Sequence, residues 1–233
     1  MSKAAEDTRA LQPATAEGAG LRIGRTGAVV IIRRLEPGAA FSVVEAVLKA
    51  GLDVVEITAD SPSACETIAA LKARFAPHAL VGAGTVLSAV AAHDAMDAGA
   101  EFVVAPNTDP AVVSACLARG RLVMPGAMTP TEIVAAAALG APIIKVFPAR
   151  QLGPSYFSDI LAPLKGFRLV PTGGVSARNA ADFLRAGAFA VGVGGSLVAR
   201  ARIEAEDWRG IEDEARALAS AIAGTRGRLG VGV

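Results

Sequence analysis

The sequence predicts a single α/β domain, a (β/α)8 barrel with a short helix before its first strand. A chain of 233 residues with 52% hydrophobic residues is long and apolar enough to bury one large core. Short runs rich in Val and Ile alternate with Ala-rich segments of helical spacing, which is typical of parallel strands joined by helices. Eight such units follow one another, and eight is the number that closes a barrel of this size.

The expected strands are short apolar runs bounded by Gly, Pro, Asp or Thr, where a strand ends. In chain order they are 28–32 (AVVII), 54–57 (VVEI), 80–84 (LVGAG), 102–105 (FVVA), 122–126 (LVMPG), 143–147 (IIKVF), 169–172 (LVPT) and 188–193 (AFAVGV).

The expected helices lie after each strand, and most begin at a Pro, Ser or Thr. Gly51, Gly99 and Gly187 follow three of them, where a left-handed cap is required. The helices span 38–50, 62–75, 88–98, 110–119, 131–139, 155–164, 176–186 and 208–222. We expect residues 1–20 to form a flexible segment with a short helix, residues 21–223 the barrel, and residues 224–233 a flexible tail rich in Gly and Arg.

The charge balance argues against nucleic acid or a membrane surface as the partner and favours a small molecule. Lys and Arg number 23, Asp and Glu 22, and the net charge is +1. The first 20 residues lack the apolar core of a signal peptide, and the apolar stretch 133–144 is too short to cross a bilayer. We therefore expect a cytoplasmic protein.

Lys145 lies in the middle of the apolar run 141–150, APIIKVFPAR, and is the first candidate catalytic residue. An unpaired charged amine in a protein interior is costly, so a buried lysine normally finds a carboxylate or gives up its proton. A neutral amine can attack a ketone and form a Schiff base. A structural lysine that pairs with a carboxylate, or extends to the strand end, is the alternative.

Glu56 is the second candidate, because strand alternation lets both it and Lys145 point into the barrel. A carboxylate beside the amine can shuttle protons during addition, dehydration and carbon–carbon cleavage. The alternative is that Glu56 is only the ion partner of the lysine. Other polar residues expected at the carboxyl ends of strands, where the chemistry of these barrels takes place, include Arg33, Thr85 and Pro106-Asn107.

Two glycine pairs follow the last two strands: Gly173-Gly174 in PTGG, and Gly194-Gly195 before Ser196. Glycines let backbone N–H groups approach an anion closely, and the loops after strands seven and eight are the usual phosphate position in such barrels. Either pair alone is more typical of an ordinary turn. Together they predict a phosphate site.

Taken in order, the segments VVEIT, VGAGTV, APN, IIKVFPA, VPTGGV and VGGS resemble the class I 2-keto-3-deoxy-6-phosphogluconate (KDPG) aldolases over residues 28–197. The resemblance implies a metal-independent, cofactor-free homotrimer that cleaves a phosphorylated 2-keto-3-deoxy sugar acid to pyruvate and glyceraldehyde 3-phosphate. It further implies the roles that follow: Lys145 as the Schiff-base lysine, Glu56 as the general acid/base, Arg33 and Thr85 near the pyruvyl carboxylate, Pro106, Phe147 and Thr172 lining the cleft, and Gly173, Gly174, Gly194, Gly195 and Ser196 holding the phosphate.

Three segments, SPSACE, Pro106-Asn107 and LGPSYF, are more similar to the phosphogalactonate (KDPGal) branch. Asp60 stands where the gluconate branch has an arginine, and we expect it to orient the Arg33 guanidinium; the alternative is that Asp60 contacts a hydroxyl or a cationic group on the distal part of the substrate. His78 and His93 are not in ligand spacing, so no metal site is predicted. A phosphate-binding barrel that acts as a sugar-phosphate isomerase, an epimerase or a non-catalytic binder remains the alternative function.

Overall fold

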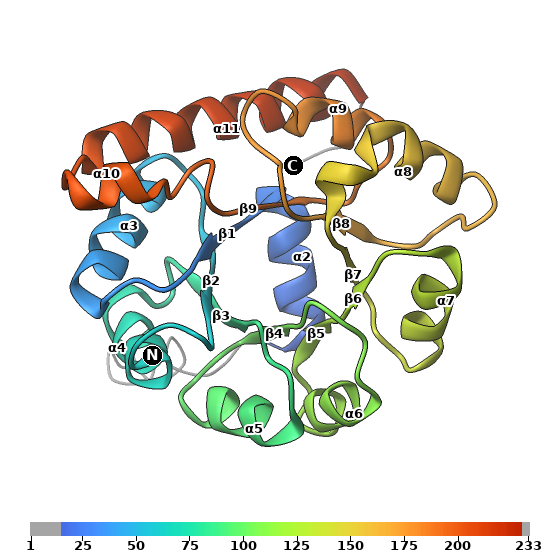
Figure 1. The fold of residues 1–233 in the computed structure, drawn as a ribbon, viewed down its shortest axis with the longest axis horizontal. Helices are drawn as coiled ribbons and strands as arrows, with labels where there is room; N and C mark the ends of the chain where they lie inside the picture. Colours follow the sequence, from blue (N-terminus) through green and yellow to red (C-terminus); the bar gives the residue numbers. More distant parts are fainter. Residues whose placement is uncertain (1–14, 230–233) are drawn as a thin grey trace, which may run out of the picture.

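The computed structural model describes residues 15–229 and has the α/β architecture expected from the sequence (Figure 1). Its helices are α2 (Ala16–Thr26), α3 (Pro37–Lys49), α4 (Ala64–Phe75), α5 (Ala89–Asp97), α6 (Pro110–Ala118), α7 (Pro130–Ala138), α8 (Gly153–Leu161), α9 (Ala180–Arg185), α10 (Arg200–Glu204) and α11 (Trp208–Leu229), with a 3-10 helix η1 (Ala149–Gln151). Its strands are β1 (Ala28–Ile32), β2 (Val54–Thr58), β3 (Leu80–Gly84), β4 (Phe102–Val104), β5 (Leu122–Met124), β6 (Gly126–Ala127), β7 (Ile144–Val146), β8 (Leu169–Pro171) and β9 (Val191–Val193).

The strands form two sheets in which every recorded pairing is parallel. One sheet has the order β5-β4-β3-β2-β1-β9 and the other β6-β7-β8. Pro125 separates β5 from β6, so the expected strand 122–126 is divided at a residue without an N–H group. At the other junction an isolated parallel bridge pairs Thr172 with Gly192, next to β8 and β9.

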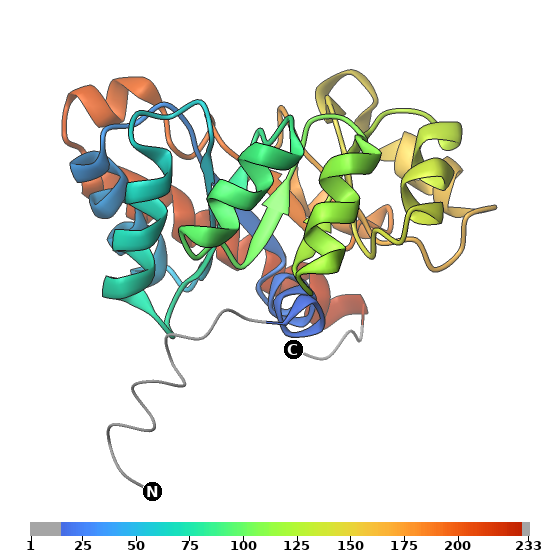
Figure 2. The same cartoon turned by 90° about the horizontal axis from the view of Figure 1, so that it is seen from below.

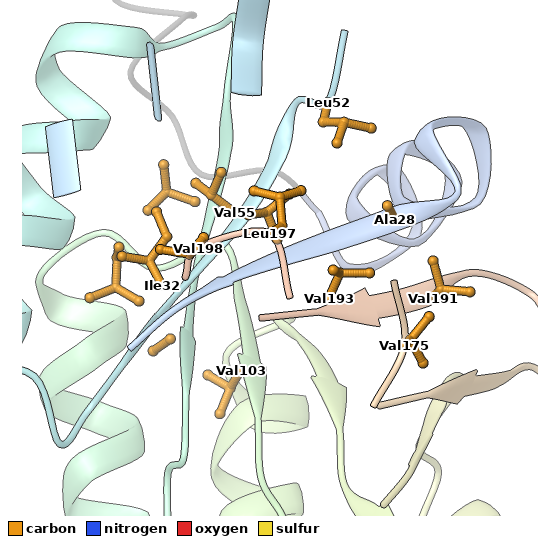
Figure 3. Packing of buried hydrophobic residues seen from close by; sticks show 14 of the residues in the cluster. Ala28, Ile32, Leu52, Val55, Val103, Val175, Val191, Val193, Leu197 and Val198 are labelled. Atoms are coloured by element: carbon orange, nitrogen blue, oxygen red, sulfur yellow. The ribbon is translucent and has the colours of Figure 1, made fainter. Parts of the chain in front are cut away.

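Alternate strand residues face two different hydrophobic clusters. Residues such as Val55, Val103 and Val191 pack under the outer helices, in the cluster drawn in Figure 3. The opposite face, which we call the inner face, carries a second cluster with α2. Its strand members are Val29, Val54, Leu80, Phe102, Val104, Leu122, Met124, Ile143, Val170 and Ala190. This alternation decides which polar side chains can enter the interior.

Helix α2 lies among the strands when the molecule is viewed as in Figure 1, and at one end of them in Figure 2. Thr15 caps it by accepting a hydrogen bond from the Gly18 N–H at 3.1 Å, and Ala19 and Ile23 are fully buried in the inner cluster. Arg226 of α11 donates to the Arg25 and Phe189 carbonyls at 2.6 and 3.1 Å. The amino ends of the strands are therefore covered, which leaves the carboxyl ends for a ligand.

All eight expected strand regions and all eight expected helices are present, with shifted ends. Helix α9 starts at Ala180 rather than at residue 176, because the Ser176 N–H donates to Asn179 Oδ1 at 2.8 Å and forms a turn before the helix. The short helices η1 and α10 were not expected. None of the helices in the described part of the chain is long and apolar enough to cross a membrane.

The expectation of a flexible tail from residue 224 is wrong for residues 224–229, since α11 continues to Leu229. Ile222 and Thr225, on either side of Gly224, are both buried, so the helix stays packed against the protein past that glycine. A short helix does precede the first strand, as α2, but it spans residues 16–26 and so crosses the expected boundary at residue 20. Residues 1–14 and 230–233, which belong to the expected flexible ends, lie outside the described residues.

Candidate active site

Lys145 on β7 and Glu56 on β2 both belong to the inner face. Each lies two residues after a member of the inner cluster, Ile143 and Val54 respectively. Lys145 is only 5% exposed and Glu56 2%. Strand alternation thus points the amine and the carboxyl group to the same inner face. They come from β2 and β7, two strands that are far apart in the sequence and belong to different sheets.

The Glu56 carboxyl group is buried, and its Oε1 has no hydrogen-bond partner. Burial raises the pKa of Glu56, while the positive charges of Lys145 and Arg33 act in the lowering direction without cancelling that effect. No ion pair joins Glu56 to Lys145 within residues 15–229. The Lys145 Nζ instead lies 5.3 Å from the centre of the Phe147 ring. The amine and the carboxyl group thus share the interior without a direct ion pair between them.

Gly84, at the end of β3, provides the space that the Glu56 carboxyl group occupies. A Cβ atom at Gly84 would overlap the carboxyl carbon and Oε1 of Glu56. The register explains this closeness, because Glu56 pairs with Gly82 and Thr58 with Gly84 along the same ladder. The second glycine of VGAGTV, Gly84, is therefore required because any side chain there would overlap Glu56 of β2.

Arg33 and Thr85 meet at the rim of the interior, after β1 and β3. The Arg33 Nη2 donates to Thr85 Oγ1 at 2.7 Å, and Thr85 adopts a positive φ of 57°. Asp60 lies 3.7 Å from Arg33 Nη1, but its nearer partner is the Nε of Arg34, at 2.8 Å. The sequence expectation that Asp60 supports Arg33 thus holds only in part, since Asp60 bridges both arginines.

The pKa of Asp60 is lowered on balance. Partial burial acts to raise it, but hydrogen bonds from Thr58 and Arg34 and the charges of Arg33 and Arg34 outweigh that effect. Asp60 is therefore an ionised anchor for two guanidinium groups near neutral pH.

The three residues expected to line the cleft lie around Lys145. The Thr172 N–H donates to the Val146 carbonyl at 3.0 Å, and the Thr172 carbonyl accepts from the Ala149 N–H at 2.8 Å, so the end of β8 is tied to β7 on both sides of Phe147. Phe147 remains 40% exposed. A Cβ atom at Gly126, which pairs with Lys145, would overlap the Pro106 carbonyl group.

The two glycine pairs lie side by side. The Ser196 hydroxyl donates to the Val175 carbonyl at 2.7 Å, which joins the loop after β9 to the loop after β8. Gly173 and Gly174 have φ values of 90° and 84°, a region that favours glycine. Within residues 15–229, the backbone N–H groups of Gly173, Gly174, Gly195 and Ser196 make no hydrogen bond. Four free donors at the carboxyl ends of two strands can bind an anion.

Comparison with known proteins assigns this chain to a family. A sequence model of the KDPG and KHG aldolase family matches residues 19–213. The chain belongs to this family. Its curated relatives include a probable 2-dehydro-3-deoxy-6-phosphogalactonate aldolase of Rhizobium meliloti, 39% identical over 72% of this chain and 80% of the relative. A 2-dehydro-3-deoxy-phosphogluconate aldolase of Treponema pallidum is also 39% identical, over 67% of this chain and 73% of the relative.

A solved structure of the KDPG aldolase from Legionella pneumophila superimposes with a TM-score of 0.79. The two are 26% identical over 86% of this chain and 97% of the other, and the Legionella enzyme contains pyruvate captured as a covalent carbinolamine intermediate. The fold of this chain is thus shared with an aldolase that forms a covalent adduct with pyruvate.

Two residues near this candidate site make contacts that the sequence did not predict. Arg34 is the nearer partner of Asp60, and Arg150 packs against Gly174. The position of Arg150 directly after IIKVFPA was the available signal, but only the fold shows that it reaches the loop after β8. Among residues 15–229, no group of three or more His, Cys, Asp or Glu side chains is arranged to hold a metal ion.

Proposed function

We propose that this chain is a class I aldolase that cleaves a 2-keto-3-deoxy-6-phospho sugar acid to pyruvate and glyceraldehyde 3-phosphate. The observation that carries the proposal is the buried Lys145, which shares the inner face with Glu56 without forming an ion pair with it. Membership in the KDPG and KHG aldolase family supports the same chemistry. So does the carbinolamine in the Legionella relative, which is the product expected when an amine adds to a ketone.

In the proposed mechanism the Lys145 amine attacks the C2 ketone, and the carbinolamine loses water to give an iminium ion. The C4 hydroxyl then gives its proton to the Glu56 carboxylate while the C3–C4 bond breaks. The electron pair of the C3–C4 bond moves toward the iminium group and forms an enamine, and the aldehyde leaves. Glu56 returns the proton to C3, and water hydrolyses the resulting imine to release pyruvate. The raised pKa of Glu56 suits a group that must both accept and donate a proton.

The two ends of the substrate bind different polar groups in this proposal. Arg33 and Thr85, already hydrogen-bonded to each other, contact the carboxylate next to the ketone. The N–H groups of Gly173, Gly174, Gly194, Gly195 and Ser196 hold the phosphate. Thr172, Phe147 and Pro106 line the space between them. No metal or other cofactor takes part in these steps.

We further infer that the two sheets together make a closed (β/α)8 barrel. The Lys145 N–H donates to the Pro125 carbonyl at 2.9 Å, at the junction of β5 and β6, and the Thr172–Gly192 bridge lies at the junction of β8 and β9. Both gaps between the sheets are therefore short and spanned by backbone contacts.

A cytoplasmic homotrimer is the assembly we propose. Large apolar side chains such as Leu87, Val90 and Val134 are 57%, 70% and 45% exposed on the single chain, and contacts between subunits would bury side chains of this kind. Light scattering coupled to size-exclusion chromatography measures the mass, and a monomer at micromolar concentration would exclude this assembly.

Incubation with pyruvate, followed by borohydride reduction and peptide mass mapping, tests the chemistry. We expect a reduced pyruvate adduct on Lys145 and none on the exposed Lys165, which serves as the internal control. An unmodified Lys145, under conditions that trap a known class I aldolase, would favour the isomerase, epimerase or binder instead. Cleavage rates for the gluconate and galactonate epimers then assign the branch, since a relative of each kind is 39% identical to this chain.

A further inference from the structure

The loop after β7 packs directly against the glycine loop after β8. A Cβ atom at Gly173 would lie 3.2 Å from a ring carbon of Phe147. A Cβ atom at Gly174 would lie 2.7 Å from the Cβ of Arg150 and 3.0 Å from its Nε. The stem of Arg150 therefore lies against Gly174, one of the residues of that loop with a free N–H group, and its Nε is close to the same residue.

The Arg150 guanidinium has no partner in the part of the chain that the structure describes: it makes no hydrogen bond and no ion pair there. Other arginines at the strand ends differ, since Arg33 binds Thr85 and Arg34 binds Asp60. An exposed arginine without a partner is common on protein surfaces. Arg150 is unusual in its position, because it adds a full positive charge to a set of uncharged donors that are themselves free.

Backbone N–H groups and a guanidinium complement each other as ligands for phosphate. The N–H groups of a glycine loop supply directed donors, and the planar fork of an arginine binds two phosphate oxygens at once. A phosphate monoester carries about −1.5 to −2 charges at neutral pH, so a cation beside the neutral donors strengthens its binding.

We propose that Arg150 is a specificity-determining residue that binds the distal phosphate of the substrate and thereby selects phosphorylated over unphosphorylated keto acids. The proposal rests on the proposed function and deepens it, because it assigns a charge to a phosphate site that otherwise consists of backbone and hydroxyl donors.

The test compares Arg150→Gln and Arg150→Lys with Arg209→Gln. Arg209 is an exposed arginine in the groove between α3 and α11, so its replacement removes the same charge away from β7 and β8. KM and kcat are measured for cleavage of the phosphorylated sugar acid, together with the inhibition constant of inorganic phosphate. We expect Arg150→Gln to raise both KM and the inhibition constant by roughly 10- to 100-fold, the loss typical of one charge-assisted contact.

Arg150→Lys keeps the charge but not the fork, and it should fall between wild type and Arg150→Gln. Arg209→Gln should match the wild type. An Arg150→Gln protein with a wild-type melting temperature and wild-type KM would overturn the proposal. So would an equal loss in Arg209→Gln, since this would reflect net charge alone.

Exchange of the pyruvate methyl protons with deuterium oxide separates failure of this inference from failure of the proposed function. The exchange requires enamine formation on Lys145 but no phosphate. A wild-type protein that does not exchange contradicts the aldolase itself, and the Arg150 inference falls with it. A protein that exchanges and cleaves substrate, but is insensitive to Arg150→Gln, contradicts only the inference.

Discussion

Gly84→Ala is expected to inactivate the enzyme although Gly84 carries no functional group. The added Cβ would overlap Oε1 and the carboxyl carbon of Glu56, so the carboxyl group must leave its present place on the inner face. A positioned general acid/base contributes about 10²- to 10⁴-fold to turnover, and a displaced one contributes little of that. We therefore expect kcat to fall by roughly the same factor as in Glu56→Gln.

The control is Gly38→Ala, because Gly38 lies in α3 and a Cβ atom there meets nothing within 4 Å. Steady-state cleavage is measured for Gly84→Ala, Glu56→Gln and the double variant, with thermal unfolding to show that each is folded. If Gly84→Ala acts through Glu56, the double variant should be no slower than Glu56→Gln alone.

Multiplied losses in the double variant would mean that Gly84 affects catalysis by another route. A folded Gly84→Ala protein with wild-type kcat would refute the placement of Glu56 at the reacting atoms.

Three further outcomes are expected. Lys145→Ala should abolish cleavage and pyruvate trapping while circular dichroism stays native, and loss of the fold would instead mark the lysine as structural. Glu56→Gln should change the pH dependence of stability: burial raises the pKa of Glu56 in the folded state, so its contribution is fully present below the unfolded pKa near 4.5 and is lost as pH rises through the folded pKa. Denaturant unfolding should thus show the Gln variant gaining stability relative to wild type from acidic to neutral pH, and a constant difference would contradict this. Arg33→Ala should raise KM for any 2-keto acid, and Asp60→Asn should raise it less because Arg33 keeps Thr85 as a partner; unchanged pyruvate affinity in Arg33→Ala would exclude the carboxylate contact.

The pattern of residues within each segment was sufficient to predict the order and type of the main helices and strands. Most strands are short apolar runs, with Glu56 and Lys145 as the charged exceptions, and each expected helix has helical spacing, so short-range preferences and burial agree. The inward direction of Glu56 and Lys145 followed from the two-residue period of strands, which is a local property. The tail after residue 224 was mispredicted because its Gly and Arg content is typical of mobile chain ends, whereas Ile222 and Thr225 hold it against the rest of the protein.

Contacts between segments far apart in the sequence were decided by the tertiary structure alone. Asp60 binds Arg34 more closely than Arg33, and Arg150 lies against Gly174, because the strand ends converge at one edge and fix which loops touch. The sequence by itself determined which residues face the interior and which chemistry they can perform, since alternation and side-chain type are carried by each segment alone. The pairing of charges at the rim, the space for the Glu56 carboxyl group and the packing of Arg150 against the glycine loop after β8 depend on distances between segments, which arise only when the strands assemble.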